Sequence, residues 1–298
     1  MITTRNRRED LLRTCAALER LDPSPVEVLI TLDGCTDGSE EAVRAAHPGF
    51  QLFSNAAPRG SIASRDAMVR KAQSDIVLSL DDDSYPVESD FIARILSLFQ
   101  CNARLAIAWF PQRTDEFPET LAQTDFGPSE FTGSYSSAGA AIRRSVFIEL
   151  GGYPHFFGHA YEEPDYVLRC VCAGYQARLE TSMTIRHHYT QVQRNEMRTH
   201  HFHARNELWS ILLRCPLPQL FGVALFRIAR QFGYAWHRGL GWALQEPRWW
   251  WKCLLGVGPC WRGRSPLPWR GYLEWMRLLR QPIAYEKEWL SRFPSSPR

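Results

Sequence analysis

Long apolar runs are missing from this chain of 298 residues. It contains no window of about 18 consecutive apolar residues, so we expect no membrane-spanning helix. The longest approach, at residues 220–226, is interrupted by Arg227 and Arg230. The opening residues are polar and basic without an apolar stretch, so we also expect no secretory signal. Both absences favour a cytoplasmic protein.

The cysteines follow no regular pattern. Eight are present, but no Cys-x-x-Cys pair occurs and their spacing is irregular. A disulfide framework of the kind found in small secreted proteins therefore receives no support, and we expect mostly reduced, buried thiols. The sequence also lacks internal repeats and low-complexity segments. What remains is a globular composition in a chain long enough to bury a substantial core.

Charge and tryptophan are distributed unevenly along the chain. Residues 190–298 hold 17 Lys or Arg against 6 Asp or Glu, whereas residues 1–189 hold 18 against 26. Ten of the 11 tryptophans lie in the second part. Arginine together with tryptophan is typical of a membrane interface, so we expect this part to contact anionic lipid head groups and no nucleic acid.

Short apolar runs alternate with amphipathic segments over the first part of the chain. This order predicts βαβ units and a mainly parallel sheet flanked by helices, which is a Rossmann-like α/β fold. Ser61 is expected to cap one of the helices. Three amphipathic stretches in the second part predict helices. We therefore expect an α/β domain at residues 1–190 and a helical extension at residues 191–298.

Three consecutive aspartates, Asp81, Asp82 and Asp83, follow a predicted buried strand at residues 75–80. Like charges repel, so a fold that keeps them together needs a nearby cation. In an extended strand, Asp81 and Asp83 would share one face and Asp82 would point to the other. Two converging carboxylates form an oxygen site suited to Mg²⁺ or Mn²⁺. The alternative is a solvated acidic turn.

A second acidic residue, Asp33, follows the predicted strand at residues 26–32. Ligands of parallel α/β sheets bind beyond the carboxyl ends of the strands. Asp33 and Asp81 should therefore lie on the same edge of the sheet, which supports a binding site there.

Four short segments occur in a recognisable order. They are Thr-Thr-Arg-Asn-Arg at 3–7, Leu-Asp-Gly-Cys-Thr-Asp-Gly-Ser at 32–39, Leu-Asp-Asp-Asp at 80–83, and Gly-Gly-Tyr at 151–153 followed by Glu-Glu-Pro-Asp at 162–165 and Leu-Arg at 168–169. A weaker fifth segment is Ala-Arg-Asn at 204–206. Together they resemble motifs of the family-2 glycosyltransferases with a GT-A fold, and more closely of their rhamnosyltransferase-like members. The resemblance covers residues 1–215 and favours the metal interpretation of the acidic triplet.

The resemblance implies roles for the matched residues. Asp81 and Asp83 would hold Mg²⁺ or Mn²⁺ against the diphosphate of a nucleotide-sugar, with His187 as a further ligand. A structural role is the alternative for His187, which stands beside His188. Glu163 would act as the general base of an inverting reaction. For Glu163, the alternative is an electrostatic role at the start of a helix. Donor contacts would come from Thr4, Asp33, Arg65, Asp81 and Asp82.

The implied activity is transfer of a hexose or deoxyhexose from a nucleotide-diphosphate donor. The acceptor would be lipid-linked or a polysaccharide of the cell envelope. Peripheral contact through residues 191–298 would hold the enzyme at the inner face of the membrane. The adjacent indoles of Trp249, Trp250 and Trp251 point in different directions on a helix, so one or two should lie at an interface.

Several features depart from the family pattern. Leu32 replaces the first Asp of a pair, which leaves base selectivity open, and Pro164 inside the acidic motif is able to shift the helix start. Only three residues precede Thr4, so we expect the true start to lie upstream. His200, His201 and His203 are spaced too unevenly to bind one metal ion.

Two other functions remain open from the sequence. One is a catalytically inactive relative that acts as a membrane-associated binding or scaffold protein. The other is a nucleotidyltransferase, which would need a glycine- and lysine-rich phosphate loop that residues 5–8 lack.

Overall fold

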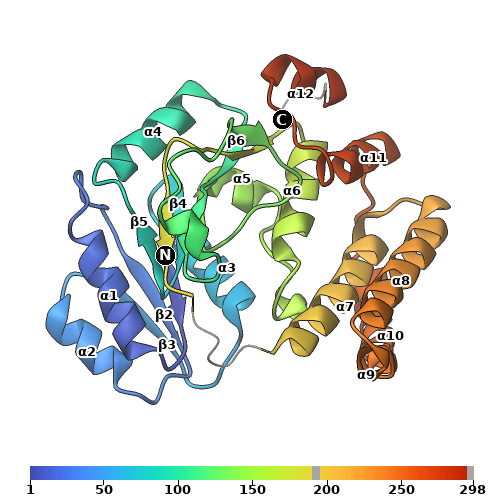
Figure 1. Ribbon diagram of the computed structural model, residues 1–298, viewed down its shortest axis with the longest axis horizontal. Helices are drawn as coiled ribbons and strands as arrows, with labels where there is room; N and C mark the ends of the chain where they lie inside the picture. Colours follow the sequence, from blue (N-terminus) through green and yellow to red (C-terminus); the bar gives the residue numbers. More distant parts are fainter. Residues whose placement is uncertain (190–194, 294–298) are drawn as a thin grey trace.

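A mainly parallel sheet of eight strands forms the centre of the computed structural model, which describes residues 1–189 and 195–293 (Figure 1). The strand order is β3-β2-β1-β4-β9-β6-β10-β8. Neighbours pair in parallel except where β9 and β8 take part. The strands are β1 (Ile2–Thr4), β2 (Leu29–Asp33), β3 (Gln51–Asn55), β4 (Ile76–Asp81), β6 (Leu105–Trp109), β8 (Glu130–Phe131), β9 (Gly139–Arg143) and β10 (Gln176–Leu179).

Helices cover both faces of this sheet, which explains why every residue of β2 is buried. Helices α1, α2 and α4 share one apolar core with β1, β2 and β4, while α3, α5 and α6 share another with the opposite face. The predicted α/β fold is confirmed. These helices are α1 (Arg8–Leu18), α2 (Ser39–Ala46), α3 (Ser61–Lys71), α4 (Phe91–Cys101), α5 (Arg144–Glu149) and α6 (Glu162–Cys172).

A second, three-stranded sheet lies beside the end of β4. Strand β11 (Ile185–His187) pairs with β5 (Ser84–Pro86) and with β7 (Gln112–Thr114). In this register His187 is opposite Ser84, the residue that follows the three aspartates. The small sheet therefore brings the end of β11 to the acidic triplet. Two short 3-10 turns lie at Pro118–Leu121 and His155–Phe157.

The predicted helical extension is also confirmed. Its helices pack on the α/β part: Trp249, Trp275 and Trp289 are fully buried and belong to the same apolar core as α3 and α6. The predicted boundary between residues 190 and 191 lies outside the described residues. The helices of the extension are α7 (Glu196–Arg214), α8 (Gln219–His237), α9 (Leu240–Ala243), α10 (Glu246–Arg262), α11 (Trp269–Leu278) and α12 (Glu286–Arg292).

One local prediction was wrong. Ser61 is the first residue of α3 and makes no capping hydrogen bond, because Gly60 occupies the cap position with a φ of 91°. A Cβ atom on Gly60 would lie 2.6 Å from the carbonyl oxygen of Gly158, so only glycine fits there. This contact joins the β3–α3 loop to the loop that precedes α6.

Candidate active site

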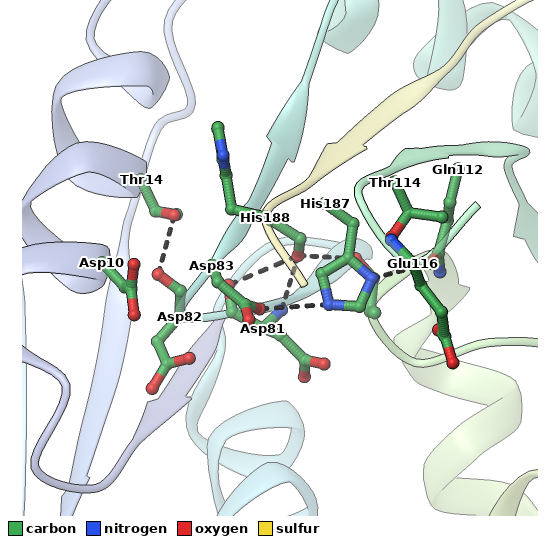
Figure 2. Close-up of polar contacts among 12 residues, drawn as sticks. Asp10, Thr14, Asp81, Asp82, Asp83, Gln112, Thr114, Glu116, His187 and His188 are labelled. Atoms are coloured by element: carbon green, nitrogen blue, oxygen red, sulfur yellow. Dashed lines mark hydrogen bonds and ion pairs between the residues drawn. The ribbon is translucent and has the colours of Figure 1, made fainter. Parts of the chain in front are cut away.

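The three aspartates stand on a turn at the carboxyl end of β4. The strand ends at Asp81, so the strand alternation that we assumed for Asp82 and Asp83 does not apply. The turn is held instead by Ser84, whose hydroxyl accepts from the Asp81 N–H at 2.8 Å and donates to the Ala138 carbonyl at 2.7 Å. It directs Asp81 and Asp83 to one cluster (Figure 2).

Asp81, Asp83 and His187 each offer one ligand atom, and these atoms lie within 4.8 Å of one another. No other group of three such side chains is found among residues 1–189 and 195–293. The Nε2 atom of His187 is 3.2 Å from Oδ1 of Asp83. Its Nδ1 atom is 2.8 Å from Oε1 of Gln112, a pure acceptor, so Nδ1 carries the proton (Figure 2). When Nε2 is protonated it pairs with the Asp83 carboxylate, and loss of that proton leaves an Nε2 lone pair for a metal ion.

This donor set fits a hard divalent cation. Two carboxylates and one imidazole suit Mg²⁺ less well than Mn²⁺, and both better than soft metals. Burial opposes the charged form of Asp83, but the hydrogen bond and charge of His187, together with the charge of Arg7, hold its pKa below the ordinary value. Asp83 is therefore kept as a carboxylate, the form that binds metal. His188 lies outside the cluster and contacts the Tyr85 hydroxyl at 2.9 Å.

Arg7 is a site residue that the sequence analysis missed. Its guanidinium donates to Asp82 at 2.8 Å and to Asp83 at 2.7 Å. Burial raises the pKa of Asp82 to about 7, Arg7 opposes this rise, and the charge of Asp83 adds to it. The Thr4 hydroxyl donates to the other oxygen of Asp82 at 2.8 Å. Thr4 and Asp82, both predicted donor contacts, are thus bonded to each other beside the cluster.

Arg65 lies between the acidic turn and the start of α6. It is 7% exposed, forms an ion pair with Asp81, and its Nη1 atom is 3.8 Å from Oε1 of Glu162. Helix α3 supplies it from the face opposite to α1. One buried cation therefore connects the predicted metal ligands with the acidic pair at 162–163.

Helix α6 begins at Glu162, so Pro164 falls in its first turn and does not shift the predicted start. Glu162 is 3% exposed, and burial together with the charge of Glu163 raises its pKa well above the ordinary value despite the attraction of Arg65. The neutral form of Glu162 is therefore favoured more strongly than in an exposed glutamate. Glu163 is less buried, and its Oε1 atom accepts from the Ser137 hydroxyl at 3.0 Å.

Asp33 has a structural task at the neighbouring strand end. Its carboxylate accepts from the N–H groups of Arg59 and Gly60, each at 2.9 Å, and from the Asn55 amide at 2.7 Å. Beside it lies a cavity of about 300 Å³ at the ends of β2 and β3. Leu32, Cys35, Thr36, Ser54 and Asn55 are among the residues that line it. Asp33 reaches this cavity only through Asn55.

The structure thus brings Thr4, Asp81, Asp82, Asp83 and His187 into one network with Arg65. Glu163 adjoins this network through Glu162 and is held by Ser137, and Asp33 lies at the end of β2, the strand beside β1. The sequence analysis missed Arg7, Gln112 and Ser137. The Asn-Arg pair at 6–7 in the first motif was a signal for Arg7, whereas no quoted motif contains Gln112 or Ser137. His200 is 2.8 Å from the buried Glu246 and belongs to the core of the extension.

Comparison with known proteins identifies one family and several solved structures of similar fold. The family model described as glycosyl transferase family 2 matches residues 1–157, which is more than half of the chain. None of the curated proteins compared with the chain matches it.

Similar solved structures include the mannosyltransferase PcManGT from Pyrobaculum calidifontis with GDP-Man and Mn²⁺, at TM-score 0.57 and 18% identity, covering 99% of this chain and 83% of that one. A fragment of S. aureus TarS with UDP-GlcNAc has TM-score 0.57 and 13% identity over 83% and 77% of the chains. GalNAc-T7 with UDP, GalNAc and Mn²⁺ has TM-score 0.58 and 12% identity over 72% of this chain. This chain spans only 47% of GalNAc-T7. At these identities the similarity concerns the fold.

Proposed function

The chain belongs to glycosyl transferase family 2, and on that premise we propose that it transfers a sugar, with inversion, from a nucleotide-diphosphate donor to an acceptor hydroxyl. The observation that carries the proposal is the position of Arg65. It contacts Asp81 on one side and approaches Glu162 on the other. The metal site at Asp81, which would bind the leaving diphosphate, and the acidic pair at 162–163, which would accept a proton, therefore lie on either side of Arg65 and can act on one substrate.

Asp81, Asp83 and His187 are the residues that would hold Mg²⁺ or Mn²⁺. Such an ion supplies charge neutralisation for a departing diphosphate. The solved structures of PcManGT and GalNAc-T7 contain Mn²⁺, which supports the same choice here. Arg65, a permanent cation, adds positive charge at the same place. Thr4, Asp33, Arg65, Asp81 and Asp82 remain the proposed donor contacts, with the nucleotide base in the cavity beside Asn55.

Glu163 is the proposed general base. A base must be charged before it can accept a proton, and burial disfavours the charged form of Glu162, whose pKa it raises, so the less buried Glu163 is the better candidate. The hydrogen bond from Ser137 fixes the direction of its carboxylate. A single displacement needs the base on the acceptor side and the leaving group on the other, so inversion is the outcome that this arrangement supports.

We further propose that a hexose or deoxyhexose is transferred to a lipid-linked or cell-envelope acceptor at the inner face of the membrane, and the surface of the extension supports the membrane part of this proposal. The outer side of helices α8, α9 and α10 is called the α8–α10 surface below. The rings of Phe232 on α8 and Trp250 on α10 lie in contact, with their centroids 6.3 Å apart. The only acidic residue of this surface, Glu246, is fully buried. Among the described residues, no helix is both long and apolar enough to cross a bilayer. The exposed apolar side chains of the surface include Phe221, Leu225, Trp236, Leu244, Trp251, Leu254, Leu255 and Trp261, and its exposed cations are Arg230, Arg238, Arg248, Lys252 and Arg262.

A panel of UDP- and GDP-sugars tests the enzymatic part. We expect at least one of them to raise the melting temperature only with Mn²⁺ or Mg²⁺, and to release nucleoside diphosphate on turnover. Asp83→Asn should remove both effects. Metal-dependent binding without any turnover would instead indicate an inactive binding protein, and no binding at all would reject the proposal.

Vesicle sedimentation tests the membrane part. We expect binding to phosphatidylcholine vesicles that contain phosphatidylglycerol, and loss of that binding in the double variant Leu254→Glu, Leu255→Glu. Leu96→Glu on α4, which is 42% exposed, is the matched control. Unchanged sedimentation of the double variant would contradict the proposal. Self-association that the same variant abolishes would assign the surface to a second copy of the chain.

A further inference from the structure

The turn that leads into α6 has an unusual backbone. Gly158, Ala160 and Tyr161 all have positive φ, at 71°, 66° and 73°. Two of these residues carry a Cβ atom, so the left-handed conformation costs free energy that other contacts must offset. The turn ends at Tyr161, which precedes Glu162 directly and makes no side-chain capping bond. The position of the α6 start therefore depends on whatever holds this turn.

Asn206 on α7 makes that contact. Its side-chain amide donates to the carbonyl oxygens of Phe157, His159 and Ala160, at 3.1, 2.7 and 2.8 Å. The residue is completely buried. Its own carbonyl oxygen accepts from Arg205 at 2.8 and 3.0 Å, which fixes the direction of the amide group. The two amide hydrogens of Asn206 are thus shared among three carbonyls of the left-handed turn, and the carbonyl of Phe157 also accepts from the His159 N–H at 2.8 Å and from Arg205 at 2.6 Å.

The next residue on α7 supports the same turn from the side. The Tyr161 hydroxyl donates to Glu207 at 3.4 Å. Glu207 is held in turn by α8, through Arg230 at 2.8 Å and Gln231 at 2.6 Å. The extension therefore contacts the turn through two neighbouring side chains, Asn206 and Glu207.

We propose that Asn206 is a positioning residue for glycosyl transfer: by holding the left-handed turn at residues 157–161, it sets where Glu163 points. This inference rests on the proposed role of Glu163. It gives the Arg-Asn pair at 205–206 a task at the reaction centre. It also separates that task from the donor side, where Asp81 pairs with Arg65 and Asp83 with Arg7.

Two variants test the inference. Asn206→Ala removes the amide donor, and Asn206→Asp replaces it with an oxygen that would face three carbonyl oxygens. We expect kcat for nucleotide release from the best UDP- or GDP-sugar to fall by ~10²-fold, since misplacement by an ångström costs about that much. The Kd of UDP or GDP with Mn²⁺ should stay within about twofold, because the donor side is intact. Equal kcat in Asn206→Ala and the wild type would overturn the inference.

Two further variants separate positioning from general loss of stability. Ser210→Ala removes the 2.9 Å hydrogen bond from α7 to Asp165, one turn further along the same helix. It should lower the melting temperature without the loss of kcat. Ala160→Gly in the Asn206→Ala background removes the cost of one left-handed residue and should restore kcat several-fold. If Ser210→Ala lowers kcat as much, or if the glycine restores nothing, Asn206 is only structural.

Hydrogen exchange provides a readout that does not require turnover. In Asn206→Ala, amides at residues 155–163 should exchange faster while those at residues 79–84 keep their protection. This distinguishes the two possible failures. A wild type that is inactive with every donor rejects the proposed function, whereas unchanged exchange at residues 155–163 rejects the positioning role by itself.

Discussion

Replacing Glu162 or Glu163 by glutamine should lower kcat to different extents, slightly for Glu162→Gln and strongly for Glu163→Gln. The two side chains are neighbours at the start of α6, but burial and the charge of Glu163 raise the pKa of Glu162. Glutamine is an isostere of a neutral carboxylic acid, so Glu162→Gln preserves the form that this raised pKa favours. Glu163→Gln removes the group that we propose as the proton acceptor.

The expected magnitudes differ by more than tenfold. General base catalysis contributes about 10²–10⁴-fold, so Glu163→Gln should lower kcat by that factor, equivalent to about 3–5 kcal/mol of transition-state free energy. In Glu162→Gln the loss should stay within about tenfold, because one altered neutral hydrogen bond is worth about 1 kcal/mol. The metal-dependent binding of UDP or GDP should be the same in both variants.

Stability should separate the two residues as well. The pKa of Glu162 is raised in the folded state above the ordinary 4.5. The folded protein therefore binds a proton that the unfolded chain has released, and the wild type loses stability as the pH rises from 4.5 toward the raised value. Glu162→Gln has no such group. Its melting temperature relative to the wild type should thus increase as the pH rises above about 4.5.

The assay is release of nucleoside diphosphate from the sugar donor that supports turnover, with melting curves recorded on the same samples. One result would refute the reasoning: full activity in Glu163→Gln together with loss of activity in Glu162→Gln. Glu162 would then be the base, and its burial beside Arg65 would need another explanation. A pH-independent difference in melting temperature would contradict the raised pKa of Glu162.

Three further outcomes follow from the structure. Asp83→Asn should abolish the extra stability that UDP or GDP confers with Mn²⁺, about 2.7 kcal/mol at a hundredfold excess over Kd, which thermal melting measures. Arg7→Met should lower the free energy of unfolding by about 2 kcal/mol, a figure discounted for the partial exposure of Arg7. Because Arg7 and a metal ion would compete for Asp83, the variant should also enlarge the rise in melting temperature that Mn²⁺ produces, and a smaller rise would contradict this competition. Gly256→Ala should destabilise by about 1–3 kcal/mol in urea unfolding, because its Cβ atom would lie 2.2 Å from Trp209, whereas Gly258→Ala on the same helix should be tolerated.

The fold was predictable because its signals are local. Apolar runs of strand length alternate with amphipathic stretches, and that order alone implies a parallel sheet with helices on both faces. The carboxyl ends of the strands then form one edge, so Asp33 and Asp81 were expected near each other. The helical character of the extension was predictable for the same reason, because its amphipathic stretches have helical periodicity.

The inner order of the site was not predictable, because it depends on contacts between distant segments. Asp81 and Asp83 were expected together on the grounds of strand alternation, but the strand had already ended, and a turn fixed by Ser84 brings them together. Nothing in the residues around Arg7 or Ser137 indicates that one pairs with Asp82 and the other with Glu163. These contacts span 75 and 26 positions along the chain.

Glu207 has a consequence for how the protein responds to its surroundings. This single carboxylate accepts from Arg230 and Gln231 on α8 and from Tyr161 ahead of α6. A displacement of α8 is therefore transmitted through Glu207 and Tyr161 directly to the first turn of α6. A detergent or bilayer that repacks α8 should alter turnover while nucleotide affinity is preserved.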